Sequence, residues 1–295
     1  MPARFNVRAA DPAAVSVLQQ ELGLPRFIAT TLAARGVTTP QAAREFLSPS
    51  LERDWLDPYI IPGLASVVDA LEEAVRAGKH ILVFGDFDLD GISSTAVMTR
   101  ALRRFGAAQV TPFIPLRFEE GYALTPPAME RVKGFAPDVI VTVDCGISCK
   151  AEVAQLVAEG IEVIVTDHHE PSDLVPEGVP VCDPKIGDCP SSILAGVGVA
   201  LKVVQALGAR FGTPHAWRDY TDLATLGTVA DLMPMLAGNR ALVADGVARM
   251  NEAPRPCIAA LLAQAGAADR PVAAHNLSFS IIPRLNAAGR MGAAD

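Results

Sequence analysis

Acidic and imidazole side chains follow three short hydrophobic runs of this chain. The runs end in Asp86-Phe87-Asp88-Leu89-Asp90-Gly91, in Asp144-Cys145-Gly146 and in Asp167-His168-His169. Each run is β-branched and bounded by turn residues, which is typical of a buried parallel strand. Ligands of open α/β sheets bind beyond the carboxyl ends of the strands, so one rim would hold all of these groups. Such a cluster repels itself unless cations lie within it, and we therefore expect a metal site.

The first motif offers three carboxylates within five residues. Asp86, Asp88 and Asp90 precede Gly91, where we expect a positive φ. Carboxylates are hard oxygen ligands that suit Mg²⁺ or Mn²⁺, although a solvated acidic turn would have the same composition. A calcium loop of the EF-hand type is disfavoured, because its twelfth position would be Val97 rather than glutamate.

The other candidate ligands are less specific when each is taken alone. Asp144 could be a cap or a turn former, and Asp167 could cap a helix beside two surface histidines. Asp231 lies in an apolar segment, where it would be an N-cap or would be costly to bury without a partner. Mixed aspartate and histidine ligation suits Mn²⁺, and paired metals suit phosphoryl transfer. Taken together, the four segments indicate a metal-dependent enzyme.

An alternation of strands and helices has to position these residues. We predict strands at 81–85, 110–115, 139–143, 161–166 and 180–182, and helices at 64–77, 93–105, 125–133 and 150–159. Ser93 or Ser94 would cap the second of these helices. Further helices are predicted at 195–211, 219–226, 239–250 and 257–263. This rhythm predicts an α/β fold with a doubly wound, mostly parallel sheet and helices on both faces. We expect a helical lead-in over 1–60, the α/β domain over 61–235, and connecting helices over 236–295.

Composition limits the class of protein. The 295 residues are half hydrophobic and carry a net charge of −8, which argues against a surface that coats nucleic acid but allows a nuclease whose acids hold cations. No apolar run approaches the ~20 residues of a membrane span, and the first residues lead into no secretion signal. We therefore expect a cytoplasmic protein with no membrane contact. The five cysteines lack the CxxC spacing of zinc sites and are expected to be reduced.

The motifs together resemble the DHH phosphoesterase superfamily, which is named for the Asp-His-His of its third motif. Within it, the pattern is most similar to the RecJ family of single-strand-specific 5′→3′ DNA exonucleases. The first motif of the family is usually D-Y-D-A-D-G, so that Phe87 and Leu89 replace a tyrosine and an alanine. Further RecJ-like segments are 117–122, 143–146, 194–200, 227–231 and 283–290. The last of these separates the RecJ family from smaller DHH enzymes.

The resemblance implies a site with two Mn²⁺ or Mg²⁺ ions. The implied metal ligands are Asp86, Asp88, Asp90, Asp144, His168 and Asp231. Asp88 and Asp90 would each hold one ion and Asp144 would bridge both, while Asp167 would orient His168. Asp144, His168 and His169 are the implied catalytic residues, with His169 donating to a substrate phosphate.

Four further residues are candidate substrate contacts. Arg117 could bind a substrate phosphate or be a surface arginine. Arg284, like Arg290, could bind phosphate or pack against the following lobe. Tyr122 could stack on a base or belong to the core or a hinge.

The implied activity is hydrolysis of single-stranded DNA from the 5′ end, releasing 5′ mononucleotides in DNA repair and recombination. A monomer would act with a single-strand-binding protein and a helicase. The alternatives are a DHH phosphodiesterase of short oligonucleotides or signalling dinucleotides, a manganese pyrophosphatase, and a non-catalytic DHH replication scaffold. The family continues into a second, DHH-associated lobe, and we expect this chain to be truncated after the start of that lobe, within 236–295.

Overall fold

A computed structural model describes residues 8–291, and the chain divides into two compact units, Met1–Asp54 and Trp55–Asp295. The first unit is helical: α1 is Pro12–Leu22, α2 is Arg26–Ala34, α3 is Pro40–Leu47 and α4 is Leu51–Asp54. Asp11 caps α1 through the backbone N–H of Ala13, and Gly23 ends that helix in the left-handed region. The apolar faces of α1, α2 and α3 bury a small core of their own around Leu18.

The second unit is built on a five-stranded sheet in the order β2-β1-β3-β4-β5, in which every pair is parallel. The strands are β1 His80–Phe84, β2 Gln109–Phe113, β3 Val139–Val143, β4 Glu162–Thr166 and β5 Val181–Cys182. Thr166 pairs with Val143 on one side and with Cys182 on the other, so neighbouring strands end at the same level. The sheet therefore presents its carboxyl ends along one rim, as predicted.

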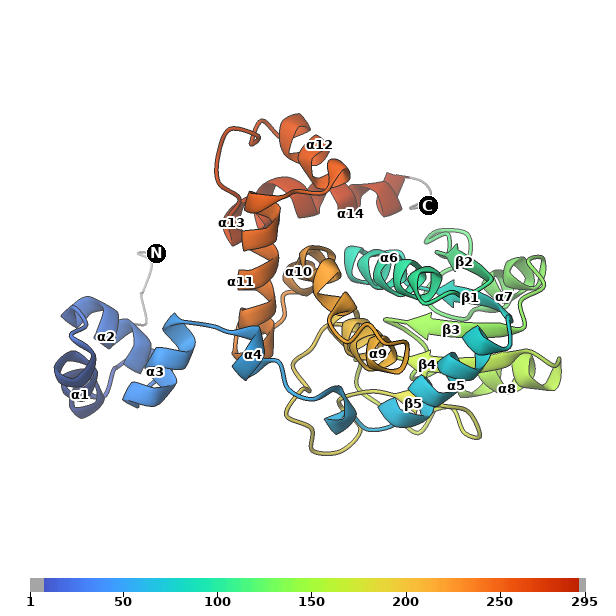
Figure 1. The fold of residues 1–295 in the computed structure, drawn as a ribbon, viewed down its shortest axis with the longest axis horizontal. Coiled ribbons are helices and arrows are strands. Elements are labelled where there is room, and N and C mark those ends of the chain that lie inside the picture. Colours follow the sequence, from blue (N-terminus) through green and yellow to red (C-terminus); the bar gives the residue numbers. More distant parts are fainter. Residues whose placement is uncertain (1–7, 292–295) are drawn as a thin grey trace, which may run out of the picture. The chain divides into compact units, whose positions relative to one another are not determined.

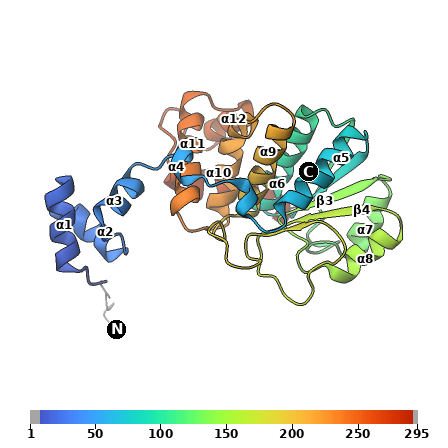
Figure 2. The same cartoon turned by 60° about the horizontal axis from the view of Figure 1, so that its bottom comes forward.

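Helices cover both faces of this sheet, which confirms the doubly wound α/β fold. Figure 2 shows α5 (Leu64–Arg76), α6 (Leu89–Arg104) and α9 (Gly196–Arg210) on one side of β3 and β4, and α7 (Pro126–Lys133) and α8 (Lys150–Ala158) on the other. The second face buries a continuous apolar core around Phe84 and Phe113, whose stacked rings lie 5.0 Å apart. Burial of this surface is the main force that holds the strand ends in place.

The remaining helices follow the sheet (Figure 1). They are α10 Thr221–Ala230, α11 Ala237–Glu252, α12 Pro256–Gln264, α13 Ala274–Asn276, a π-helical turn Leu277–Ile281 and α14 Ile282–Met291, and two 3₁₀ turns span Pro58–Ile60 and Ala216–Tyr220. An apolar cluster that includes Leu226, Met250 and Leu277 also contains Leu89, the first residue of α6. The helices after the sheet are thereby packed against the first acidic motif.

Within residues 8–291, no helix is long and apolar enough to cross a membrane.

The start of α6 differs from the sequence prediction. The helix begins at Leu89 rather than at Ser93, because the Asp88 carboxylate accepts hydrogen bonds from the N–H groups of Asp90 and Gly91 and acts as the cap. The expected positive φ of Gly91 is also wrong. Glycine is required there for space, since a Cβ would lie 2.4 Å from the carbonyl oxygen of Asp86.

The end of α10 corrects a second expectation. Asp231 is the C-cap of this helix and not an N-cap, because α10 continues to Ala230. A carboxylate at a helix C-terminus faces the negative end of the helix dipole, which is unfavourable by itself. Its placement therefore points to another role for Asp231.

Candidate metal centre

The carboxylate loop after β1 is fixed by the first turn of α6. Asp86 and Asp90 are buried, and Asp88 holds the turn through its two cap hydrogen bonds. Burial, followed by the charge of Asp88, raises the pKa of Asp86 to about 7. One carboxylate oxygen of Asp86 is buried without a hydrogen-bond partner. A charged group in this position needs a cation.

Asp90 is held by the N-terminus of α9. Its Oδ2 accepts a hydrogen bond of 2.7 Å from the N–H of Gly196, and its Oδ1 accepts one of 3.0 Å from the N–H of Val197. These bonds and the helix dipole favour the carboxylate. Burial nevertheless outweighs them and raises the pKa of Asp90 to about 7. The two hydrogen bonds thus fix the direction of the Asp90 side chain, but they do not keep its pKa at the ordinary value of an aspartate.

Asp144 occupies the centre of the rim. It directly follows β3 and takes a left-handed backbone conformation with a φ of 61°. The backbone of α9 packs directly against it, since a Cβ on Gly196 would lie 2.4 Å from Asp144 Oδ1. Burial, with the charges of Asp90 and Asp88, raises the pKa of Asp144 well above its usual range. Its Oδ1 is buried and lacks a hydrogen bond.

The ring of His168 joins the carboxylates. Its Nε2 lies 3.0 Å from Asp144 Oδ1, 3.7 Å from Asp90 Oδ2 and 3.8 Å from Asp231 Oδ2. Its Nδ1 lies 3.1 Å from the carbonyl oxygen of Leu194, which assigns the proton to Nδ1. Burial lowers the pKa of His168 to about 4. The ring is therefore neutral and turns a lone pair toward the acids, as a metal-binding histidine does.

Asp167 contacts the other histidine. We expected Asp167 to orient His168, and its Oδ1 accepts a hydrogen bond of 2.7 Å from the backbone N–H of His168. The same oxygen lies 2.7 Å from Nδ1 of His169, while the ring of His168 contacts the carbonyl of Leu194. The second oxygen of Asp167 accepts from the N–H of Ile147 at 2.9 Å, which anchors the carboxylate below the turn. The hydrogen bond that His169 donates to Asp167 raises the pKa of His169, whose side chain is 47% exposed. His169 is thus an accessible donor.

The structure brings the six predicted metal ligands together. Three sets have ligand atoms that all lie within 4.8 Å of one another: Asp86, Asp88 and Asp144; Asp90, His168 and Asp231; and Asp144, His168 and His169. The first two sets together contain the six predicted ligands. Carboxylates and a neutral imidazole suit Mn²⁺ and Mg²⁺, and cations would satisfy the buried oxygens of Asp86 and Asp144 that have no hydrogen-bond partner. The residues present therefore fit two divalent ions.

An aromatic and cationic edge borders this cluster on the side of β1 and β2. The guanidinium of Arg117 lies 4.6 Å from the centre of the Phe87 ring, which meets the Tyr122 ring edge-on at 6.3 Å. The Tyr122 ring lies 6.1 Å from that of His169. Arg117 and Tyr122 are therefore close to the predicted centre. Arg284 is exposed on α14 and donates to the carbonyl of Ser280, and among residues 8–291 no hydrogen bond or ion pair joins it to the cluster.

Sequence reasoning missed three polar residues near the rim. Asn286 on α14 accepts a hydrogen bond of 3.0 Å from the N–H of Leu89, between two of the predicted ligands. Asp183 and Lys185 follow β5. The rule that identified the other motifs, polar groups after a strand, also applies to these two, but a two-residue strand gives little periodicity.

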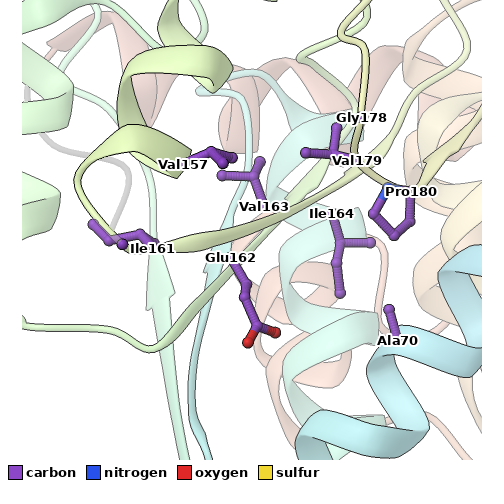
Figure 3. Close-up of a pocket in the computed structure, with 10 residues that line it drawn as sticks. Ala70, Val157, Ile161, Glu162, Val163, Ile164, Gly178, Val179 and Pro180 are labelled. Atoms are coloured by element: carbon purple, nitrogen blue, oxygen red, sulfur yellow. The ribbon is translucent and has the colours of Figure 1, made fainter.

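A separate pocket of about 310 Å³ lies at the amino-terminal half of β4 (Figure 3). Its lining is mostly apolar, with Val157, Ile164 and Pro180 among the residues that face it. The candidate metal ligands follow the opposite ends of the strands. This pocket is therefore distinct from the metal centre.

Comparisons with known proteins bear on this geometry. The N-terminal domain of the DHH family matches residues 80–228. The single-stranded-DNA-specific exonuclease RecJ of Escherichia coli is 41% identical over 245 residues, covering 78% of this chain and 42% of that protein. RecJ of Bacillus subtilis is 34% identical and covers 99% of this chain and 36% of that protein. The chain thus spans about two fifths of the length of these curated relatives.

Solved structures of RecJ exonucleases are also similar to this chain. RecJ of Thermus thermophilus in complex with Mn²⁺ superposes with a TM-score of 0.81 at 36% identity, covering 98% of this chain and 41% of that one. An exonuclease RecJ bound to manganese superposes with a TM-score of 0.71 at 42% identity, covering 79% of this chain and 59% of that one. The sheet and helices described above are therefore those of a DHH domain.

Proposed function

This chain belongs to the DHH family, and on that premise we propose that it is a two-metal phosphodiesterase that hydrolyses single-stranded DNA from the 5′ end and releases 5′ mononucleotides. The observation that carries this proposal is the approach of His168 Nε2 to Asp144 Oδ1 at 3.0 Å, which joins the two sets of ligands into one cluster. Similarity to RecJ exonucleases over most of the chain supports the choice of substrate.

The two ligand sets divide the ions between them. Asp86, Asp88 and Asp144 would hold one ion, and Asp90, His168 and Asp231 would hold the other. Asp144 Oδ1 lies 3.0 Å from His168 Nε2 of the second set, so Asp144 is the residue that would serve both ions. Paired divalent ions supply a water of lowered pKa and stabilise the charge that develops on the phosphate. The protein contributes the fixed positions of the ligands, which the N-terminus of α9 and the carbonyl of Leu194 secure.

His169 acts on the substrate. Its pKa is raised by Asp167 and its side chain is partly exposed, so that it is protonated more readily than the buried His168. It donates to a non-bridging phosphate oxygen, where charge accumulates during hydrolysis. Arg117 binds a phosphate on the side of β1 and β2, since a guanidinium forms paired hydrogen bonds with phosphate oxygens. Tyr122 offers a ring on which a base stacks.

The proposal is tested with one oligonucleotide labelled with ³²P at either its 5′ or its 3′ end. With Mn²⁺, the 5′ label should be released as mononucleotide from the first time points, whereas the 3′-labelled strand should shorten gradually. The matched duplex should be spared, and EDTA or Asp144→Asn should abolish release. We also propose a single-strand-binding protein and a helicase as partners, which would present such strands.

Two outcomes of this experiment would contradict the proposed function and support another one. If a dinucleotide is hydrolysed while long strands persist, the chain is a phosphodiesterase of short oligonucleotides. If the protein binds Mn²⁺ and single strands but releases no label from either end, it is a non-catalytic DHH scaffold.

A further inference from the structure

A lysine follows the fifth strand at the rim that carries the metal ligands. β5 ends at Cys182, and the Asp183 side chain accepts a hydrogen bond of 2.7 Å from the N–H of Lys185. The carbonyl of Asp183 also accepts one of 3.2 Å from the N–H of Ile186. Asp183 is fully buried, so this turn is anchored in the protein. The backbone of Lys185 therefore has a fixed position.

This turn lies beside the Asp-His-His motif. The N–H of Asp167 donates to the carbonyl of Cys182 at 3.0 Å, which sets the residues after β4 next to those after β5. Nζ of Lys185 lies 3.2 Å from the Glu170 carboxylate, and Glu170 directly follows His169. The positive charge of Lys185 is thus placed next to the proposed phosphate donor.

The ion pair with Glu170 leaves Lys185 available to a ligand. The Glu170 side chain is 83% exposed, whereas that of Lys185 is 23% exposed. Ion pairs with an exposed partner are worth little, because water competes for both charges and the long side chains lose entropy. A phosphate can therefore replace Glu170 as the partner of Lys185 at little cost.

Lys185 and Arg117 lie at opposite ends of the rim. Arg117 follows β2 and its guanidinium lies over the ring of Phe87, which follows β1. Lys185 follows β5, and its partner Glu170 follows β4. In the strand order β2-β1-β3-β4-β5, the two cations therefore come from opposite sides of β3. A polyanion that crosses the strand ends over the metal centre would meet a cation on either side.

We propose that Lys185 binds a backbone phosphate of the single strand, on the opposite side of the metal centre from Arg117. The ammonium group suits this role because it binds a phosphate as a compact point charge. This inference rests on the proposed function, since it assigns a second contact to the same substrate. In this proposal, Glu170 competes with the phosphate for Lys185. Removing the charge of Glu170 should therefore tighten binding of the strand.

Lys79 provides a matched control. It forms an ion pair of 2.6 Å with Glu162, its side chain is 24% exposed, and it lies at the amino end of β1, away from the rim. Lys79→Gln and Lys185→Gln therefore remove similar ion pairs at opposite ends of the sheet. Any difference between the two variants reports on the rim.

Binding is measured on a 3′-fluorescein single strand with Ca²⁺ in place of Mn²⁺ over a series of salt concentrations. Losing one phosphate contact should lower the slope of log K against log salt by about 0.7 and weaken binding roughly three- to tenfold. Lys185→Gln should show both changes and Lys185→Arg neither. Glu170→Gln should tighten binding, and Lys79→Gln should match the wild type.

Turnover with Mn²⁺ supplies the second readout. Lys185→Gln should raise KM for the strand with little change in kcat, as expected for a group that binds substrate and transition state equally. A small phosphodiester with one phosphate should be hydrolysed at the wild-type rate. Manganese content should also be unchanged.

The outcomes separate the two proposals. If the wild type cuts the strand but Lys185→Gln and Lys79→Gln behave alike, Lys185 is a surface residue and the proposed function stands. If the wild type neither binds nor cuts single strands, the proposed function fails and the role of Lys185 fails with it. A loss of manganese in Lys185→Gln would reassign the lysine to support of the metal centre.

Discussion

Adjacent histidines bind protons differently in this chain. His168 is buried among carboxylates, yet burial lowers its pKa to about 4. Its Nδ1–H donates a hydrogen bond to the backbone carbonyl of Leu194. His169 is partly exposed, and its hydrogen bond to Asp167 raises its pKa. One ring is therefore suited to bind a cation and the other to donate to an anion. The two rings lie 4.5 Å apart, so this division follows from their different partners and burial, and not from opposite side-chain directions.

Replacing each histidine by alanine should consequently affect metal binding and turnover differently. His169→Ala should keep both Mn²⁺ ions and lose roughly 10²–10³ in kcat, the usual cost of removing one donor to a transition state. His168→Ala should lose manganese first and regain part of its activity at high Mn²⁺. Bound metal and turnover, measured on the same preparations, decide the matter. The reverse pattern would mean that the roles are exchanged.

Asp144 should control both ions. Asn is the appropriate replacement, because it tolerates the left-handed backbone conformation of this position while removing the charge. We expect Asp144→Asn to reduce manganese content from two ions toward none and to abolish hydrolysis, as measured by metal analysis after dialysis. Asp138→Asn is the matched control, since Asp138 lies before the other end of β3 and caps the N–H of His80. Loss of a single ion from Asp144→Asn would show that Asp144 does not bridge.

At the scale of elements, the N-terminus of α9 is the part that shapes the centre. Gly196 donates to Asp90 and touches Asp144, so one residue positions two carboxylates. A Cβ there would lie 2.4 Å from Asp144 Oδ1, which real structures do not show. The glycine is required by close packing rather than by an unusual φ.

Gly196→Ala should therefore damage the centre. We expect at least a roughly tenfold loss of manganese affinity and a loss of stability of about 1–3 kcal/mol, which is typical of overpacking. Gly198→Ala in the same helix is the control, because its Cβ would meet only the Leu194 side chain at 3.2 Å. Calorimetric titration with Mn²⁺ and urea unfolding would separate the two variants. Equal affinities would show that Asp144 can move aside.

A second element-scale prediction concerns α9 and the buried Lys202. Burial lowers the pKa of Lys202 to about 7, and its amine donates to the carbonyl of Leu56. Between pH 7 and the ordinary pKa of lysine, near 10.4, the unfolded chain binds a proton that the folded chain does not. The wild type should therefore gain stability relative to Lys202→Met as pH rises, by about 1 kcal/mol per unit between pH 8 and pH 10. Urea unfolding of both proteins at several pH values tests this, and parallel curves would contradict it.

The strands, their parallel arrangement and both helical layers could be anticipated because buried parallel strands and amphipathic helices have strong periods. The residues that cap the helices could not be anticipated, because aspartate and serine favour several turn geometries. Thus Asp88 rather than Ser93 starts α6, and Asp231 ends α10 rather than beginning a helix. The partners of Asp167 and Gly196 depend on segments far apart in the sequence, and local patterns hold no information on such contacts.

At the scale of the whole molecule, charge limits how DNA can be held. The chain carries a net charge of −8, and five of its carboxylates, those of Asp86, Asp88, Asp90, Asp144 and Asp231, lie in the metal centre. Without ions, this rim repels phosphates in the place where the strand has to bind. Two divalent ions add four positive charges and offset most of these five negative charges. The metal should therefore act in substrate binding as well as in hydrolysis.

Single-strand binding by this chain should accordingly require a divalent ion. In anisotropy measurements at fixed ionic strength, replacing Ca²⁺ by EDTA should weaken binding by roughly tenfold or more, because uncompensated acids then face the phosphates. Asp144→Asn in Ca²⁺ should bind as weakly as the wild type in EDTA if its ions are lost. Asp138→Asn should bind like the wild type under both conditions. If EDTA leaves wild-type affinity unchanged, the strand must be held at a distance from the metal centre, and the path from Arg117 to Lys185 across the strand ends would be wrong.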